Sequence, residues 1–462
     1  MKIKDETVFQ LEGRPRFWVA LPLGMQHILA MFVSNVAPIL IITGIVGLEP
    51  ALTRIMVQAA MFTSAVTTLL NVYGVKIGNY QVGSRLPIVM GTSFAFVGVA
   101  GAVGAELGLG AVVGAAIAAA VLEILIGIFY KQIKRVLNPL VTGTLLIALG
   151  LYLINVGGNY FLGGFGPNRG TPQSLIVATI VLLVSLGIRI YGKGLLKSSG
   201  ILIAIVVGYL ISIPMGLVSF SNLGDLQALS FKALVPLTVI RPEFVPSAII
   251  SFAVVYFASA VETIGDIKGV AIGGLNREAT DDEIRGGLLA DGIGSMFSVF
   301  FNGLPNTSFG QNVGIVSSTK VVNRHVVGIG AAFLIIVSFF PQVSEIIRLI
   351  PDAVMGGALI TVFAIIVANG IKVLVQAGAS ENNLFIIAVS LGVGLGLGGN
   401  QTFLEAVPKF VGYLFSTTIS ATALTAIVAS LIIKPDWSHG TYDPDDGVKI
   451  EITEIVEDEV EE

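Results

Sequence analysis

Residues 286–319 read GGLLADGIGSMFSVFFNGLPNTSFGQNVGIVSST and include a single charged side chain, Asp291. The first part is apolar enough for a membrane helix, but 303–314 contains Gly, Pro and Asn residues that disfavour a helix. A straight crossing of a ~30 Å hydrocarbon core takes about 20 residues. If Arg285 and Lys320 lie on the same side of a membrane, the stretch is too short for two straight crossings. We therefore predict that it is broken, partly extended or re-entrant.

The composition of the whole chain points to a membrane protein. Of the 462 residues, 54% are apolar and 12% are charged, whereas an average soluble protein has roughly 25% charged residues. So few charges could not cover a soluble globule, which excludes a soluble enzyme, a nucleic-acid-binding protein and a disordered chain. The 55 Gly residues favour close contacts between membrane helices, and the lack of Cys excludes disulfides and thiolate chemistry.

Fourteen apolar segments can be counted, and the basic residues give their orientation. Four of the segments, at 107–130, 244–263, 286–303 and 307–319, are short or interrupted by charge. With an even number of crossings both termini lie on one side, and that side then holds all but six of the 26 Lys and Arg residues. The six are Arg54, Arg169, Lys232, Arg241, Arg348 and Lys409. This asymmetry follows the positive-inside rule, so we predict a multi-pass protein of the inner (cytoplasmic) cell membrane with cytoplasmic termini.

Two pairs of segments indicate an internal repeat. Leu-Pro followed by Thr-Ser-Phe occurs within 86–94 and again within 304–309, and the stretch 139–143 resembles 351–356. The members of each pair are seven segments apart, and because seven is odd, the second half must run upside down relative to the first. Inverted repeats are typical of secondary transporters, whose substrate sites lie at short, Gly/Pro-interrupted segments in corresponding places of the two halves.

Glu262 and Asp266 are the most informative charges inside the apolar segments. An ionised group at the centre of a membrane helix costs ~2.5–3.5 kcal/mol on insertion scales, so each one needs a reason. The two residues are four positions apart and therefore share a helix face. Because two ionised carboxylates on one face repel each other, one of them should hold a proton, as a proton-coupled carrier requires. The alternative for Asp266 is an ion pair with Lys268 or with another basic residue of the inner surface.

Other polar residues inside the apolar segments are weaker indications of function. His27 is either a relay or orienting group or a hydrogen-bonded structural residue. Asp291 is either functional or a capping residue, and Glu123 fits a structural role between helices. Gln311 and Asn312 follow the break, and their amides offer a donor and an acceptor to a planar ligand with adjacent N–H and C=O groups.

Several motifs of the chain resemble those of a known family. Gln-Asn-Val-Gly at 311–314, followed by Thr319 and Lys320, is similar to the signature of the nucleobase–ascorbate transporter family. Gln-His at 26–27, the stretch 91–96 and Glu-Thr-Ile-Gly-Asp at 262–266 agree in order. The resemblance covers nearly the whole chain, from about residue 16 to residue 434.

The resemblance implies an all-α polytopic membrane protein of fourteen segments, arranged as two inverted seven-segment repeats. Short β-strands are expected in the discontinuous third and tenth segments. A core domain would combine 17–130 with 241–345, and a gate domain would combine 131–240 with 346–434. Residues 1–16 would form a cytoplasmic N-terminal segment and 435–462 an acidic cytoplasmic tail. A homodimer formed largely through the gate domain is also implied.

The resemblance further implies a substrate site between the two strands. The carboxylate of Glu262 would accept hydrogen bonds from base N–H groups, and Gln311 would make the second side-chain contact, with help from the backbone of Phe94 and Gly310. Four further residues would take part in proton coupling or in the hydrogen-bond network of the site: His27, Asp266, Asp291 and Asn312. Transport would proceed by alternating access and be driven by H⁺, with Na⁺ less expected, and no cofactor is implied.

Two residues favour an oxidised purine such as xanthine or urate as the substrate. Members that carry uracil tend to have Glu where this chain has Gln311, and His where it has Asp266. An amide can donate to a purine carbonyl and accept from a neighbouring N–H group, whereas an ionised Glu can only accept. A uracil permease is the alternative within the family. An anion transporter or channel on the same fold is the alternative from another class, and the acidic site disfavours it. Membrane lipid is an expected partner.

Overall fold

The structure is a computed structural model that describes residues 5–134, 138–164, 166–192, 196, 199–218, 235–237, 239–443 and 447–448. Most of these residues are helical, which confirms the predicted all-α class of membrane protein. The greater part of the acidic tail lies outside the described residues.

The first half of the chain contains long helices, an exposed pair of strands and one buried strand. The elements are η1 (Glu6–Phe9), α1 (Phe17–Val46), α2 (Pro50–Tyr73), β1 (Val75–Ile77), β2 (Tyr80–Val82), β3 (Met90–Thr92), η2 (Phe94–Phe96), α3 (Val97–Leu107), α4 (Leu109–Ile128), α5 (Tyr130–Ile133), α6 (Pro139–Phe161), α7 (Pro172–Tyr191) and α9 (Gly200–Ser212). Asn138 and Thr171 cap the first turns of α6 and α7, and each is followed by a Pro residue, which suits the first helical position.

The second half follows a similar order and ends in a small hairpin. The elements are α10 (Pro246–Leu275), α11 (Asp281–Phe300), β4 (Asn306–Ser308), α12 (Gly310–Thr319), α13 (Arg324–Ser338), α14 (Pro341–Arg348), α15 (Asp352–Ala377), α16 (Glu381–Leu397), α17 (Gln401–Ala406), α18 (Lys409–Leu414), α19 (Thr418–Ile432), β5 (Tyr442–Asp443) and β6 (Gly447–Val448). A capping box between Thr280 and Glu283 starts α11, so this helix begins before Arg285 and leaves room for the extended strand that follows.

Several helices are suited to crossing a membrane. Within the described ranges, seven helices are long and apolar enough, or eight if α13 and α14, which meet at 88°, count as one bent span. Shorter apolar helices include α9, α16 and α19. The multi-pass character is therefore confirmed, whereas the number of fourteen crossings, the inverted repeats and the boundaries of the core and gate domains stay predictions.

The described ion pairs include two groups whose basic residues are predicted to lie on opposite sides of the membrane. Arg85 and Arg324 both pair with Glu12 near the N-terminus, and Lys134 pairs with Asp281 at 3.9 Å. All three basic residues are predicted to lie inside. Arg348 and Arg54, which are predicted to lie outside, instead share Glu345 at 2.5 Å and 3.5 Å. This grouping agrees with the predicted sidedness, and the side that faces the cytoplasm stays a prediction.

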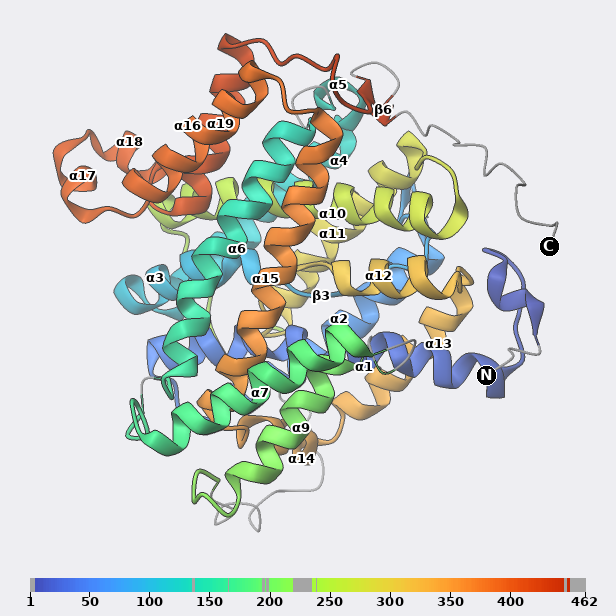
Figure 1. Cartoon of the computed structure of the whole chain (residues 1–462), viewed down its shortest axis with the longest axis vertical. Helices are drawn as coiled ribbons and strands as arrows, with labels where there is room; N and C mark the ends of the chain where they lie inside the picture. Colours follow the sequence, from blue (N-terminus) through green and yellow to red (C-terminus); the bar gives the residue numbers. More distant parts are fainter. Residues whose placement is uncertain are drawn as a thin grey trace, which may run out of the picture.

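Glycine residues let helices approach closely, as their abundance predicted. The helices α6 and α15 run side by side in opposite directions (Figure 1). A Cβ atom on Gly143 would lie 2.9 Å from the carbonyl oxygen of Gly370, and one on Gly150 would lie 2.9 Å from the amide nitrogen of Val367. Larger side chains would push these backbones apart, so small residues determine this packing.

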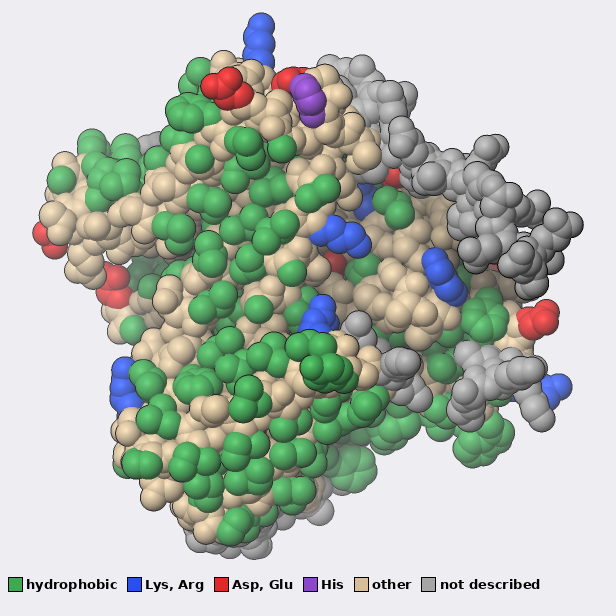
Figure 2. Space-filling view, viewed as in Figure 1, with side chains coloured by type: hydrophobic (Ala, Val, Ile, Leu, Met, Phe, Trp, Pro, Cys, Tyr) green, Lys and Arg blue, Asp and Glu red, His purple; other side chains and the backbone are tan. Residues whose placement is uncertain are grey.

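The outward faces of the helices are apolar. Figure 2 shows hydrophobic side chains spread over most of one face of the molecule, with few charged groups among them. Large exposed side chains come from α7, α9, α16 and α19, and they include Leu183, Ile190, Leu210, Phe385 and Ile432. Surfaces of this extent are unusual on soluble monomers and fit contact with lipid.

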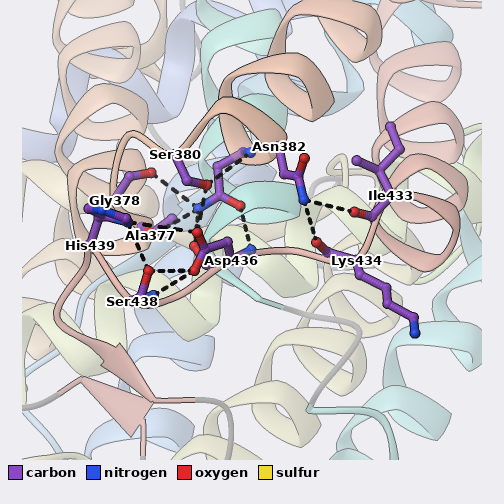
Figure 3. A network of polar contacts seen from close by, with 10 residues as sticks. Ala377, Gly378, Ser380, Asn382, Ile433, Lys434, Asp436, Ser438 and His439 are labelled. Atoms are coloured by element: carbon purple, nitrogen blue, oxygen red, sulfur yellow. Dashed lines mark hydrogen bonds and ion pairs between the residues drawn. The ribbon is translucent and has the colours of Figure 1, made fainter.

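A polar network connects the end of α15 to the chain that follows α19 (Figure 3). Its centre is Asn383, which is fully buried. The side-chain nitrogen of Asn383 donates to the carbonyl oxygens of Ala377 at 2.9 Å and Asp436 at 2.6 Å. Its side-chain oxygen accepts from the amide of Asp436 at 3.0 Å. One amide therefore joins three separate parts of the chain.

The Asn383→Ala variant is expected to lose about 2–3 kcal/mol of stability, because it leaves buried backbone groups without partners. Thermal unfolding of the detergent-solubilised protein would measure the loss. Asn382→Ala is the matched control, since Asn382 is exposed and its bonds to Ile433 and Lys434 are 3.4 Å and 3.3 Å long. Equal losses in the two variants would contradict the prediction.

Candidate functional site

Two short strands from opposite halves of the chain meet inside the molecule. β3 pairs with β4 in antiparallel register, with Met90 opposite Ser308 and Thr92 opposite Asn306. All six residues of the pair are buried. Gly91 is required in this pair, because a Cβ atom there would collide with the ring of Phe309. The pairing confirms the predicted strands in the two discontinuous segments.

Polar side chains from neighbouring helices bind the edge of β3 that faces away from β4. The side-chain oxygen of Asn35 on α1 accepts from the amide of Thr92 at 2.8 Å and from the hydroxyl of Ser64 at 2.7 Å. The hydroxyl of Thr68 on α2 accepts from the amide of Met90 at 2.9 Å. Extended backbone inside a membrane protein must find such partners, because the bilayer core offers none.

The edge of β4 is held in the same manner. The hydroxyl of Ser295 on α11 donates to the carbonyl oxygen of Asn306 and accepts from its amide, both at 3.0 Å. The side chain of Asn306 donates to Thr67 on α2 at 2.9 Å. Sequence reasoning missed these supporting residues, as it missed Asn35 and Thr68, since single Ser, Thr and Asn residues are common in membrane helices.

Each strand leads directly into a helix. β3 continues into η2 and α3, and β4 continues into α12, which begins at Gly310. Helix N-termini present unbonded N–H groups and a partial positive charge. The predicted backbone contacts at Phe94 and Gly310 therefore lie at the start of two broken helices, next to the strand pair.

The long helix α10 brings two carboxylates to this place. Glu262 lies near the middle of its thirty residues, and the helix continues beyond Asp266 to Leu275. The hydroxyl of Ser308 donates to Asp266 at 2.6 Å, and a Cβ atom on Gly310 would lie 3.1 Å from a carboxylate oxygen of Asp266. Asp266 therefore contacts the strand and α12 rather than Lys268.

The carboxylate of Glu262 is left open. Its side chain is half-buried, and no described residue donates a hydrogen bond to it. Glu262 lies one helical turn before Asp266 on the same face of α10, and α10 packs against both β4 and α12. An acceptor that is neither paired nor fully exposed is suited to a ligand with N–H groups.

The side chains that follow Gly310 contact α1. The amide nitrogen of Asn312 lies 2.9 Å from Nδ1 of His27 and donates to the carbonyl oxygen of His27 at 3.2 Å. The side chain of Gln311 reaches the hydroxyl of Ser34 at 3.4 Å and remains half-buried. The structure thus brings together His27 and Asn312, which the sequence analysis predicted separately.

Phe94 and Asp291 contact different helices. The ring of Phe94 packs edge-to-face on Phe363 of α15 with 5.1 Å between ring centres, so it contacts the region predicted as the gate domain. Asp291 on α11 is fully buried and accepts a hydrogen bond from Thr263. It is therefore connected to the site through another side chain rather than being open to it.

Space is available on one side of the site. A Cβ atom on Gly265 or Gly314 would meet no other atom within 4 Å, and Gly314 is exposed. These glycines lie one helical turn beyond Glu262 and Gly310, towards the C-terminal ends of α10 and α12. Gly314 is close in sequence to Lys320, whose ammonium group donates to the carbonyl oxygen of Gly273 near the end of α10. The roles of the predicted site residues stay predictions.

Comparison with solved structures gives the fold. The transmembrane domain of the cyanobacterial bicarbonate transporter BicA superposes with a TM-score of 0.52 at 17% identity, covering 91% of this chain and 100% of that one. SLC26A9 superposes with a TM-score of 0.56 at 13% identity, covering 89% of this chain and 65% of that one. The chain therefore shares the fold of these membrane transporters.

Sequence comparison gives the family. Residues 19–400 match Xan_ur_permease, a permease family. The xanthine permease XanQ of Escherichia coli is 32% identical, over 93% of this chain and 94% of the relative. The uric acid transporter UacT of Escherichia coli is 34% identical, over 90% of this chain and 86% of the relative. The xanthine permease of Bacillus subtilis is 33% identical, over 91% of this chain and 94% of the relative. The chain therefore belongs to the nucleobase–ascorbate transporter family, as its motifs predicted.

Proposed function

We propose that this permease carries an oxidised purine, xanthine or urate, across the cell membrane. The observation that carries the proposal is the open carboxylate of Glu262, which lies on α10 beside the helix that bears Gln311. The carboxylate would accept from ring N–H groups, and the amide would donate to a ring carbonyl and accept from its neighbour. Relatives whose names state xanthine or uric acid support this choice.

We further propose that transport is H⁺ symport. No Lys or Arg of the described residues pairs with Glu262, Asp266 or Asp291, so a bound proton is the means at hand to neutralise these carboxyl groups. Alternating access would occur by movement of the gate domain against the core domain, across contacts such as Phe94 on Phe363. A homodimer formed through the gate domain completes the proposal.

Uptake of labelled xanthine in a host that lacks its own nucleobase transporters tests this function. We expect uptake to be saturable and to fall when urate competes. Uracil should not reduce it, and a protonophore should abolish it. Uptake of uracil without xanthine uptake would overturn the purine assignment. Dependence on a Na⁺ gradient and not on a H⁺ gradient would overturn the coupling ion.

An anion transporter is the second candidate, because the fold is that of bicarbonate and SLC26 proteins. Its ligand would have to bind next to Glu262 and Asp266, and two carboxylates disfavour an inorganic anion. Competition of xanthine uptake by bicarbonate or sulfate, together with no competition by urate, would favour this candidate.

The open space at Gly314 gives a further prediction. Because the chain has no Cys, the Gly314→Cys variant carries a single thiol. We expect a membrane-impermeant maleimide to label it in inside-out vesicles and not in intact cells, and saturating xanthine to slow the labelling. Ser438→Cys is the control, since Ser438 is exposed after α19, far from the site in sequence. A labelling rate of the Gly314→Cys variant that xanthine leaves unchanged would contradict the prediction.

A further inference from the structure

We propose that Glu123 and Asp291 share one proton and form the buried end of a hydrogen-bond chain that starts at Asp266. This inference rests on the proposed H⁺ coupling and adds to it a residue, Glu123, that does not contact the substrate site. The sequence analysis gave Glu123 a structural role between helices, whereas its surroundings fit a group that stores a proton.

The two carboxyl groups meet where α4 crosses α11. Neither residue has any exposed surface. The helices pack closely there, since a Cβ atom on Gly292 would lie 3.0 Å from the amide nitrogen of Ile124. The carboxyl groups of Glu123 and Asp291 are within hydrogen-bonding reach of each other.

The pair has more acceptors than donors unless it holds a proton. Both oxygens of Glu123 and Oδ1 of Asp291 are buried without a hydrogen-bond donor. Two ionised carboxylates can only accept, so neither can satisfy the other. A proton on one carboxyl group supplies the missing donor and removes the repulsion between two buried negative charges.

No cation of the described residues can replace that proton. The titratable groups that face Glu123 are Asp291 from α11 and Glu262 from α10, and α3 and α5 contribute none among the residues described. Tyr256 on α10 lies close, but its hydroxyl already donates to the carbonyl oxygen of Ala116 at 2.9 Å. The hydroxyl of Ser259 is beside Glu123 and has one proton to donate, which is too few for both oxygens of Glu123 and Oδ1 of Asp291.

A continuous chain of hydroxyl groups connects this pair to the site. Oδ2 of Asp291 accepts from the hydroxyl of Thr263, which lies 3.4 Å from the hydroxyl of Ser308. The hydroxyl of Ser308 lies 2.6 Å from Oδ2 of Asp266 and donates to it when Asp266 is ionised. When Asp266 is protonated it donates to Ser308 instead, and the proton of Ser308 is then free to turn to Thr263. Every member between the two ends is a hydroxyl group, which can donate and accept at the same time.

A proton can cross this chain without leaving a charge on any hydroxyl. When Asp266 is protonated, it gives its proton to the oxygen of Ser308, and Ser308 gives its own proton to Thr263. Thr263 gives its proton to Asp291, so one O–H bond breaks and one forms at each hydroxyl. The net result is one proton moved from Asp266 to the Glu123–Asp291 pair.

The purified protein in liposomes tests this assignment. The Glu123→Gln variant keeps the size of the side chain and can donate to Asp291, but it cannot take up or release a proton. We expect xanthine uptake driven by an inward H⁺ gradient to fall at least about tenfold. Xanthine binding, and the exchange of labelled for unlabelled xanthine without a gradient, should stay close to wild type. The Thr263→Val variant interrupts the chain at another point. It should likewise lose gradient-driven uptake while keeping xanthine binding and exchange.

The control is Glu106→Gln at the exposed end of α3, which should leave every measurement unchanged. Gradient-driven uptake at the wild-type level in Glu123→Gln would overturn the inference. Parallel loss of uptake, exchange and binding in both variants would also overturn it, because that pattern indicates a structural role. If the wild type carries a different base, the substrate assignment fails. Gradient-driven uptake, exchange and binding are then compared with that base. A wild type that no H⁺ gradient drives would overturn both the coupling and this inference.

Discussion

Replacing Glu262 by Gln is expected to abolish xanthine uptake, with a loss of at least about a hundredfold in uptake rate at low substrate. The physical reason is the number of charge-assisted hydrogen bonds that the carboxylate can make. Each hydrogen bond to a charged group contributes roughly 1.5–3 kcal/mol, so two of them account for about 3 kcal/mol or more. Every 1.4 kcal/mol corresponds to about a factor of ten in affinity. In the Glu262→Gln variant, an N–H donor replaces one carboxylate oxygen. That donor would face an N–H group of the base and could not bond to it.

Initial uptake rates and xanthine binding to the purified variant would measure this effect. The Glu262→Asp variant keeps the charge but shortens the side chain, so we expect weaker binding with residual transport. Glu405→Gln is the control, because Glu405 is exposed on the short helix α17. Full activity of Glu262→Gln would remove Glu262 from the site.

Replacing Gly356 by Val is expected to prevent the protein from folding. Gly356 on α15 faces the backbone of Tyr160 and Phe161 near the end of α6, and a Cβ atom there would overlap backbone atoms of both residues. Side chains can rotate away from such a collision, but two packed helix backbones cannot. Overpacking a core costs about 1–3 kcal/mol when side chains can adjust, so we expect a larger cost here.

The yield of monodisperse protein after solubilisation would report the failure. Gly158→Val provides the matched control, because Gly158 is also a helical glycine of α6 and a Cβ atom there would meet nothing within 4 Å. We expect the control to fold and transport as the wild type does. Equal yields of the two variants would show that the approach of α6 to α15 does not depend on Gly356.

The sequence was sufficient to predict the class of protein and the position of the break. Because 286–319 has too few residues for two straight crossings, we predict a broken, partly extended or re-entrant stretch. The strand β4 lies within it. The family resemblance placed the matching strand in the third segment, and β3 at Met90–Thr92 lies there. The first conclusion depended on Gly, Pro and Asn residues inside an apolar stretch, and the second on the family motif.

The groups that support the site were not predictable in the same way. Thr263 and Ser308 connect Asp266 to Asp291 because of the way α10 passes β4, and no spacing in the sequence reports that crossing. Asn35 was missed because one Asn in an apolar helix has many possible partners. Glu123 was noticed as a lone charge, but its role depends on Asp291, which is on a helix distant in sequence.

The pairing of β3 with β4 has a consequence for the synthesis of the protein. A helix completes its own hydrogen bonds as it enters the bilayer, but an extended segment does not. Asn35 and Thr68, which belong to the same half of the chain, can bind one edge of β3 early. The other edge remains unbonded until residues 306–308 have left the ribosome and entered the membrane. Until then, the first half is an incomplete intermediate whose strand has one edge without a partner.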